Sequence, residues 1–442
     1  MKKLISILMA VMMLSLCACG VSVETDAEDP NEKQEAAAPA NSEGKYAGVT
    51  IEIAERYTGN TSVVFAEITK GFEAETGCKV LVTEYGDDYE NTMKTRMASN
   101  TLPDIFETHG WSILRYKEYL LDLQSESWVK DYDASALGVI QDVNGEIYVL
   151  MISELVNASL VNLEVCEAAG VDIYAVETWA DFTEACAKIK AAGFTPIGCA
   201  LGPGNLANIA GTWVSYEGEQ AEDSPAMLDG TYDWESFRPF IDTYAQWLDN
   251  GYFFDDYATM SAADASERFA QNKCAFWLGN DPKFLTGCKQ LNPDGKYAFL
   301  PTFASAEGGK CFVGVGEGET FGIWKDGQNI EACKEFLNYM ARPENVIKLT
   351  SAIGSNPCLK SSMEKSESYG LGLFMEMQEK CESRDILYEN LWDRKYMPSG
   401  MWPVFRVALE TLVADTGEAG RDAALEYLRT NYNDLYEAAH TN

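Results

Sequence analysis

The sequence is poor in histidine. His109 and His440 are the only two among 442 residues, and His440 lies almost at the end of the chain. A Ser-His-Asp triad or a histidine-rich metal site would therefore have to use His109. The run 131–135 (DYDAS) resembles a calcium loop but lacks its glycine and its closing glutamate. We predict that the protein is not an enzyme and has no cofactor and no metal site.

Basic residues are also scarce. The chain has 34 Lys and Arg against 69 Asp and Glu, which gives a formal net charge of −35. Nucleic acids and anionic lipid surfaces require a basic face, so both are disfavoured as partners. The same negative field repels acidic ligands unless a local arginine intervenes.

Cysteine is abundant but shows no ordered spacing. Besides Cys17 and Cys19, ten cysteines are scattered between Cys78 and Cys381, and no CxxC pair occurs. Several fall at core-facing positions of predicted helices, where a free thiol behaves as a small apolar side chain. We prefer mostly reduced thiols, with a disulfide framework as the alternative.

The N-terminus carries the pattern of an export signal. Lys2 and Lys3 precede the apolar run 4–16, which is too short to span a membrane comfortably. The segment 16–20 (LCACG) resembles a bacterial lipobox, with Cys19 as the lipidated residue. This predicts a signal peptide at 1–18, palmitate-type acylation of Cys19, and a disordered acidic tether at 19–46. The alternative is an ordinary secretory signal with incidental cysteines.

Strand and helix patterns alternate after the tether. The run 49–53 predicts a strand, while Val64, Ile68 and Phe72 form one stripe of a helix that Gly77 ends. A strand at 79–82, a helix at 88–99 and a strand at 103–106 follow. Such alternation predicts an α/β fold with a parallel sheet flanked by helices.

A second alternating unit begins near Leu155. Thr178 and Asp181 form a capping-box pattern ahead of a helix, and a strand is expected at 195–197. A buried strand at 274–278 is expected to break at Gly279. Further helices are predicted around 330–340 and 423–435.

Several short motifs resemble those of a known family. Residues 72–80 (FEAETGCKV) resemble F-E-x-x-T-G-x-x-V, residues 103–106 (PDIF) match PD[IV], and residues 145–148 (GEIY) resemble G-K-x-Y. The stretch 161–196 resembles YN…aG…TWdEf…aGitP, with Val161 in place of the usual tyrosine. In this order the motifs resemble the carbohydrate-binding, maltose-binding-like class (family 1) of extracellular solute-binding proteins of ABC importers.

The resemblance implies a two-lobed periplasmic-binding-protein-like fold, with hinge-joined lobes and an interlobe ligand cleft. It places one lobe at 46–152 plus 299–350 and the other at 153–298 plus 351–442, with crossings near 148–153 and 299–303. Together with the lipobox-like segment 16–20, it predicts a monomeric, lipid-anchored protein on the extracellular face of the cell membrane. Hinge closure would capture a sugar, expected to be a neutral oligosaccharide, for delivery to permease subunits. The alternatives are a binding protein for another solute, such as a polyamine, and an anchored glycoside hydrolase.

Sugar sites combine flat rings with carboxylates and amides, and ligands bind beyond the carboxyl ends of strands. We therefore expect the ligand to contact side chains that follow the predicted strands, lie near the first crossing or follow the glycine-rich run 314–318. The resemblance adds Trp213, whose region faces the cleft in the family. These candidates are Tyr57, Tyr85, His109, Trp111, Glu154, Trp213, Asn280, Asp281 and Glu319. Packing in loops or the core is the alternative for the aromatic residues, and an Asx turn is the alternative for Asn280 and Asp281. The glycine-rich run 314–318 is expected to be a loop close to the ligand, and Arg56 is the cation that could favour an acidic sugar.

Overall fold

The computed structural model divides into two compact units, Met1–Pro39 and Ala40–Asn442. The structure describes residues 44–108, 116–142, 144–199, 209–211, 213, 226–280, 282–390 and 396–440, all in the second unit. The predicted signal peptide, Cys19 and nearly all of the predicted tether lie outside these ranges. No helix within the described ranges has the length and apolar character needed to cross a membrane.

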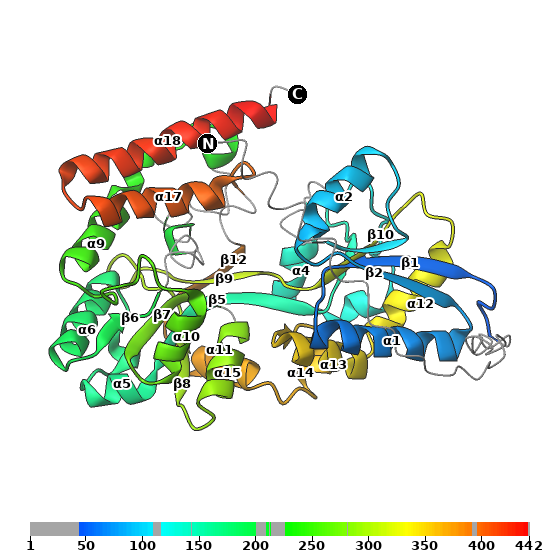
Figure 1. Ribbon diagram of the computed structural model, residues 1–442, viewed down its shortest axis with the longest axis horizontal. Helices are drawn as coiled ribbons and strands as arrows, with labels where there is room; N and C mark the ends of the chain where they lie inside the picture. The colour runs from blue at the N-terminus through cyan, green and yellow to red at the C-terminus, as the bar shows by residue number, and fades with distance from the viewer. Residues whose placement is uncertain are drawn as a thin grey trace, which may run out of the picture. The chain divides into compact units, whose positions relative to one another are not determined.

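The first of two sheets has five strands in the order β2-β1-β3-β10-β4 (Figure 1). Its strands are β1 (Thr50–Glu55), β2 (Lys79–Glu84), β3 (Ile105–Thr108), β4 (Val149–Met151) and β10 (Thr320–Ile323). The β1 strand pairs in parallel with β2 and β3, whereas β10 runs antiparallel to β3 and β4. The predicted β-α-β-α-β succession is confirmed.

Three of the helices that accompany this sheet follow the predicted patterns: α1 (Asn60–Thr76), α2 (Tyr89–Ala98) and α12 (Ile330–Met340). A fourth, α13 (Pro343–Ile353), was not predicted. Ile68 and Phe72 on α1 are buried, as the stripe predicted. Gly77 adopts a left-handed conformation with φ of 74°, and its N–H donates to the Glu73 carbonyl at 2.9 Å. This is the glycine stop expected from the sequence.

The second sheet has seven strands. Five follow the order β12-β9-β5-β7-β6, and β8 and β11 also pair with β5. Its strands are β5 (Ser153–Asn162), β6 (Thr195–Ile197), β7 (Cys274–Asn280), β8 (Tyr297–Leu300), β9 (Cys311–Glu317), β11 (Asn356–Pro357) and β12 (Ile386–Asn390). The sheet mixes parallel and antiparallel pairs, because β5 is antiparallel to β7, β8, β9 and β11.

Two local expectations about glycine are wrong. Gly279 lies inside β7 with φ of 66°, so it kinks the strand without ending it. The run 314–318 is mostly strand, because Gly314 and Gly316 pair with Asn157 and Leu155 of β5. At Gly318 a side chain is excluded, since a Cβ there would overlap the Ser153 hydroxyl.

Helices of the remaining segments complete the fold. They are α4 (Ala134–Ile140), α5 (Leu163–Ala168), α6 (Trp179–Ala191), α8 (Ala226–Asp229), α9 (Arg238–Asp249), α10 (Ala262–Ala270), α11 (Pro282–Leu291), α14 (Lys360–Met363), α15 (Tyr369–Lys380), α17 (Met401–Ala414) and α18 (Glu418–His440). Short 3-10 turns occur at Gly86–Asp88, Ser127–Asp131, Ile173–Ala175 and Trp234–Phe237. The predicted capping box at the start of α6 is confirmed, with Thr178 and Asp181 bonded reciprocally.

The chain passes between the two sheets at a defined crossing point, formed by Ile152, Ser153, Gly318 and Glu319. Here β4 leads into β5 and β9 leads into β10. The Ile152 N–H donates to the Glu319 carbonyl at 2.9 Å, and the Gly318 N–H donates to the Ser153 carbonyl at 2.9 Å. The first predicted crossing, 148–153, lies at this point. The second predicted crossing, 299–303, overlaps the end of β8, but β8 and the following β9 both pair with β5, so the chain returns to the first sheet only after β9, at Gly318 and Glu319.

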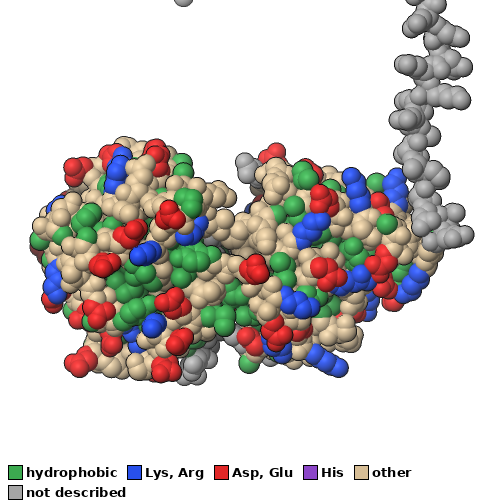
Figure 2. All heavy atoms as spheres, turned by 90° about the horizontal axis from the view of Figure 1, so that it is seen from below, with side chains coloured by type: hydrophobic (Ala, Val, Ile, Leu, Met, Phe, Trp, Pro, Cys, Tyr) green, Lys and Arg blue, Asp and Glu red, His purple; other side chains and the backbone are tan. Residues whose placement is uncertain are grey.

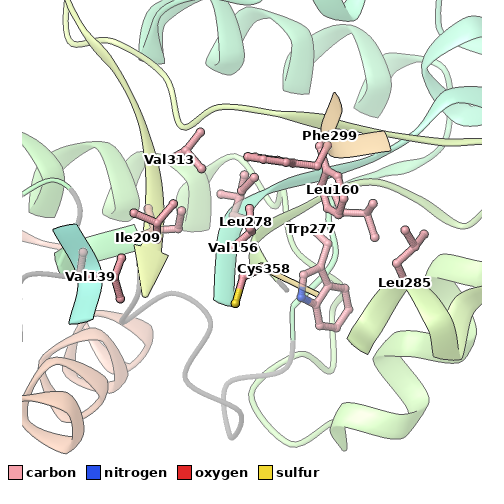
Figure 3. Close-up of a cluster of buried hydrophobic side chains, with 14 of the residues drawn as sticks. Val139, Val156, Leu160, Ile209, Trp277, Leu278, Leu285, Phe299, Val313 and Cys358 are labelled. Atoms are coloured by element: carbon pink, nitrogen blue, oxygen red, sulfur yellow. The ribbon is translucent and has the colours of Figure 1, made fainter. Parts of the chain in front are cut away.

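The core of the second sheet is built from apolar residues of sequence-distant segments. Figure 3 shows Val156 and Leu160 of β5 beside Val313, Leu278, Phe299 and Cys358. The ten cysteines from Cys78 to Cys381 are buried thiols that form no disulfide with one another, in line with the preferred interpretation of mostly reduced thiols. Acidic and basic side chains are interspersed over the face seen in Figure 2.

Candidate functional site

Three buried carboxylates meet at one edge of the first sheet. Glu55 ends β1, Glu107 lies in β3, and Glu319 immediately precedes β10, which pairs with β3. The carboxyl ends of β1 and β3 therefore meet the amino end of β10. The exposed fractions of the three residues are 0%, 1% and 3%. Isolated buried charges are very costly, so this edge needs a counter-charge or bound protons.

Arg56 supplies the counter-charge. Its Nε lies 2.8 Å from Glu107 Oε1, and its Nη2 lies 3.3 Å from Glu319 Oε2. The Arg56 backbone N–H also donates to Glu107 Oε2 at 3.3 Å. We call Arg56 with Glu55, Glu107 and Glu319 the Arg56 cluster. One guanidinium thus faces two carboxylates, and a third carboxylate lies next to it in the sequence.

Protonation balances the remaining charge of the Arg56 cluster. Burial raises the pKa of Glu55 to about 8, against the opposing effect of the hydrogen bond from the Tyr57 backbone N–H. Burial and the neighbouring Glu319 also hold the pKa of Glu107 well above its ordinary range. Glu55 Oε1 has no hydrogen-bond partner within the described ranges. At neutral pH the cluster is therefore best described as one arginine with partly protonated carboxyl groups.

One predicted site residue, Glu319, belongs to this cluster, and a second, Tyr57, contacts it. Glu319 accepts from Arg56 and from the Tyr57 hydroxyl, the latter at 3.3 Å, and its own N–H donates to the Ser153 hydroxyl at 2.8 Å. Tyr57 is 5% exposed, and its ring packs edge-on against Phe65 at a centroid distance of 5.5 Å. The structure thus brings Tyr57 and Glu319 together at the crossing point.

Tyr85 lies farther along the same sheet edge. Its ring packs edge-on against Tyr89 at 6.3 Å, and its hydroxyl accepts from Arg96 at 3.3 Å. The Tyr89 hydroxyl donates to the Glu107 carbonyl at 2.5 Å. Tyr85 is half-buried, and its backbone N–H donates to the carbonyl of Glu55 in the Arg56 cluster at 3.0 Å.

Glu154 occupies the other side of the crossing point. It lies opposite Glu317 of β9 and opposite Asn356 of β11, so the three residues form a row across neighbouring strands. Burial raises the pKa of Glu154 to about 7, and the nearby Asp133 adds to this effect. Glu154 Oε1 accepts no hydrogen bond from the described part of the chain.

Trp213 lies in an aromatic cluster. It is 6% exposed, and its ring packs at tilted angles 5.3 Å from Trp179 and 5.5 Å from Phe240. This position accounts for its burial without a ligand, and a role in sugar binding stays a prediction.

The side chains of the remaining predicted contact residues lie outside the described part of the structure. His109, Trp111 and Asp281 fall outside the described residues, as does the side chain of Asn280. The backbone of Asn280 ends β7, opposite Ala158 of β5.

Sequence reasoning missed Glu55, Glu107 and Glu317. Each lies within or at the end of a strand, where an acidic residue normally marks the solvent face. Their position could have identified Glu55 and Glu107 as candidates, because both lie at the carboxyl ends of adjacent parallel strands, where α/β sheets bind their ligands.

The acidic residues that resemble a calcium loop have structural partners. The Asp133 side chain caps α4 by accepting from the Ala136 N–H, and Asp131 accepts from the N–H and hydroxyl of Ser361. No group of three or more potential metal ligands occurs in the part of the chain that the structure describes.

Two sheets joined by strands that pass from one to the other define a two-lobed binding-protein fold. The model of the bacterial extracellular solute-binding protein family matches residues 58–347. The chain belongs to this family.

Individual relatives agree with the family. The chain is 29% identical over 364 residues to the melibiose/raffinose/stachyose-binding protein MelE of Bacillus subtilis, covering 79% of this chain and 82% of MelE. A Bacillus subtilis binding protein solved in an open conformation superimposes with a TM-score of 0.75 at 26% identity, covering 88% of this chain and 98% of the other. A Bacillus licheniformis sugar transporter protein solved with stachyose gives a TM-score of 0.71 at 26% identity, covering 88% and 100%.

Proposed function

We propose that the protein is the extracellular sugar-binding component of an ABC importer and that its ligand is a neutral oligosaccharide of the raffinose and stachyose type. The observation that carries this proposal is the similarity to MelE across most of both chains. The likeness to a stachyose complex at 26% identity supports the same ligand class. The ligand would lie between the lobes, and bending at the crossing point would close them around it.

The charges of the Arg56 cluster favour a neutral ligand. Arg56, the cation that could have attracted an acidic sugar, already lies between Glu107 and Glu319. The chain as a whole carries a formal net charge of −35, which opposes the binding of a uronic acid. A polyamine fits this overall charge, but no relative described above is a polyamine-binding protein. The family favours binding over hydrolysis, so we expect bound sugar to remain chemically intact.

Stachyose and raffinose should stabilise the purified protein against heat. A ligand that binds only the native state adds about 2.7 kcal/mol at a hundredfold excess over Kd, and this raises the unfolding midpoint. Differential scanning fluorimetry with stachyose, raffinose and melibiose checks this, with maltotriose and spermidine as comparisons. Chromatography of the recovered sugar reports any hydrolysis. A shift with spermidine and none with any sugar would replace the sugar proposal with the polyamine alternative.

We also propose that Cys19 anchors the protein to the outer face of the cell membrane, with residues 19–46 as the tether and with permease subunits as its membrane partners. The lipobox-like segment 16–20 supports the anchor. Several acyl chains would be needed, because a single chain holds a protein only weakly. We expect the protein to act as a monomer.

Replacing Cys19 should abolish anchoring. In Cys19→Ala cells, we expect the protein in the medium or unprocessed, whereas Cys17→Ala should remain in the membrane fraction. Mass spectrometry of the mature N-terminus provides the direct check. A mature protein that begins at any residue other than Cys19 would contradict the anchor.

A further inference from the structure

A pocket of about 350 Å³ lies between α11, the end of α13 and the start of α15. Its volume falls within the range of small-molecule sites, about 300–1,000 Å³. We call it the α11–α13 pocket. Polar side chains from all three segments line it, among them Thr286, Gln290, Ser351, Ser355, Ser366 and Ser368. Tyr57, Glu154 and Glu319 do not, so the pocket is distinct from the predicted sugar contacts.

The walls of the α11–α13 pocket belong to helices of both sheets. On one side, α13 packs against α1 of the first sheet, and Lys348 of α13 pairs with Glu67 of α1 at 2.6 Å. On the other side, α15 packs on β8 of the second sheet and against α11 (Figure 1). The two sides meet at Gly354, where a Cβ would lie 3.2 Å from the Thr286 hydroxyl. Rotation of one sheet against the other therefore changes the shape of this pocket.

The lining suits an uncharged ligand with many hydroxyl groups. Six of its twelve described residues are serine or threonine, and none of the twelve is Asp or Glu, so a cation would find no counter-charge among them. The Lys289 ammonium already donates to the carbonyls of Pro293 and Gly295. Tyr369 adds a flat ring that is 42% exposed. Hydroxyls that both donate and accept, next to an aromatic ring, match the surface of a sugar or another polyol.

One hydroxyl of the pocket is left unsatisfied. Ser355 Oγ is buried and has no hydrogen-bond partner within the described ranges. The Ser368 hydroxyl, by contrast, donates to the Asn356 side chain at 2.9 Å. A buried hydroxyl without a partner is costly, so a ligand that bonds to Ser355 gains free energy that water-exposed serines do not offer.

We propose that the α11–α13 pocket is a second binding site, which takes a neutral monosaccharide or a polyol of similar size. A ligand there contacts helices of both sheets, so it resists any rotation that reshapes the pocket. Closure around an oligosaccharide is such a rotation. This coupling rests on the proposed sugar-binding function, whereas the second site itself does not. We therefore expect the second ligand to lower stachyose affinity by a fixed factor.

D-Galactose is the probe for the second site. We expect it to bind the protein without stachyose at about millimolar Kd, as is usual for so small a ligand, in a protein-observed NMR titration. Ser355→Ala should weaken galactose binding by about fivefold or more, through loss of one hydrogen bond. The same variant should not lower the unfolding midpoint of the free protein, because this hydroxyl has no partner in the described part of the chain to lose.

Ser362 provides the matched control. Its hydroxyl is also buried and without a partner among the described residues, but it lies on α14 and does not line the pocket. Ser362→Ala should bind galactose as the wild type does. If galactose does not bind, or if wild type and Ser355→Ala bind it equally, the second site is refuted and the pocket holds water only.

Stachyose affinity in the presence of rising galactose tests the coupling. Coupling lowers the affinity to a plateau, by about threefold or more, whereas competition for one site has no plateau. Ser355→Ala should need at least fivefold more galactose to reach the plateau. Competition without a plateau would refute the coupling. If stachyose does not bind but galactose binding still depends on Ser355, the proposed ligand is wrong and the second site stands.

Discussion

Replacing Arg56 with alanine should lower the free energy of unfolding by about 3–5 kcal/mol, as is typical when one partner of a buried ion pair is removed. Arg56 lies 2.8 Å from Glu107 and 3.3 Å from Glu319, and neither carboxylate is more than 3% exposed. The variant would leave both carboxylates without their cation. Urea denaturation at pH 8 in the absence of sugar measures the loss.

The cost of Arg56→Ala should depend on pH in a defined direction. Burial already raises the pKa values of Glu55 and Glu107, and removing the cation raises them further. For Glu55, whose pKa is about 8, the stabilising contribution is complete below the ordinary glutamate value and is lost as pH rises through about 8. The difference between variant and wild type should therefore be smaller at pH 5 than at pH 8.

An exposed arginine supplies the matched control. Arg429 pairs with Glu235 at 2.8 Å, with side chains 41% and 55% exposed. Solvent screens such a pair, so Arg429→Ala should cost no more than about 1 kcal/mol. Equal small losses in both variants would mean that water reaches the Arg56 cluster and that its carboxylates need no cation.

The fold was predictable where local patterns and burial agree. The stripe containing Ile68 and Phe72, the Gly77 stop and the capping box of Thr178 and Asp181 each depend on residues close in the sequence. The residues that produce each feature lie within about one helical turn of one another, so the feature can be recognised from the sequence alone.

The crossing point was harder to predict because its glycine, Gly318, is needed for a contact with a residue that is distant in the sequence. Gly318 is required by the Ser153 hydroxyl, 165 positions earlier in the chain, and sequence spacing carries no sign of that contact. The Arg56 cluster was hard to predict for the same reason, since its members are distant in the sequence. Glu55 and Glu107 resemble solvent-facing residues of alternating strands, and only the return of β10 beside β3 brings Glu319 to bury them. Tyr57 was predicted because it follows the first strand, and Glu319 because it follows the glycine-rich run 314–318; their contact with a ligand stays a prediction.

Replacing Trp213 with alanine should also lower the free energy of unfolding by about 3–5 kcal/mol, the usual cost of truncating a buried large aromatic side chain. The ring is 6% exposed and packs 5.3 Å from Trp179, which itself packs 5.6 Å from Trp247 and 5.3 Å from Phe303. The cavity would therefore open inside an aromatic cluster with contacts on several sides. Urea denaturation without sugar measures this effect, and Trp213→Phe, which keeps a ring, should lose less.

Sugar affinity in the same variants tests the remaining prediction that Trp213 also contacts the ligand. If the indole stacks on a sugar ring, Trp213→Ala should weaken stachyose binding by about 1–3 kcal/mol, by analogy with stacking on nucleobases. If the indole serves only the aromatic cluster, affinity should change less than twofold under conditions where the variant is folded, while stability falls as stated. The buried position of Trp213 makes the loss of stability the firmer expectation, because it depends only on ring contacts with Trp179 and Phe240. A variant that keeps its stability but loses affinity would show that the ring belongs to the ligand site and that the aromatic cluster is stable without it.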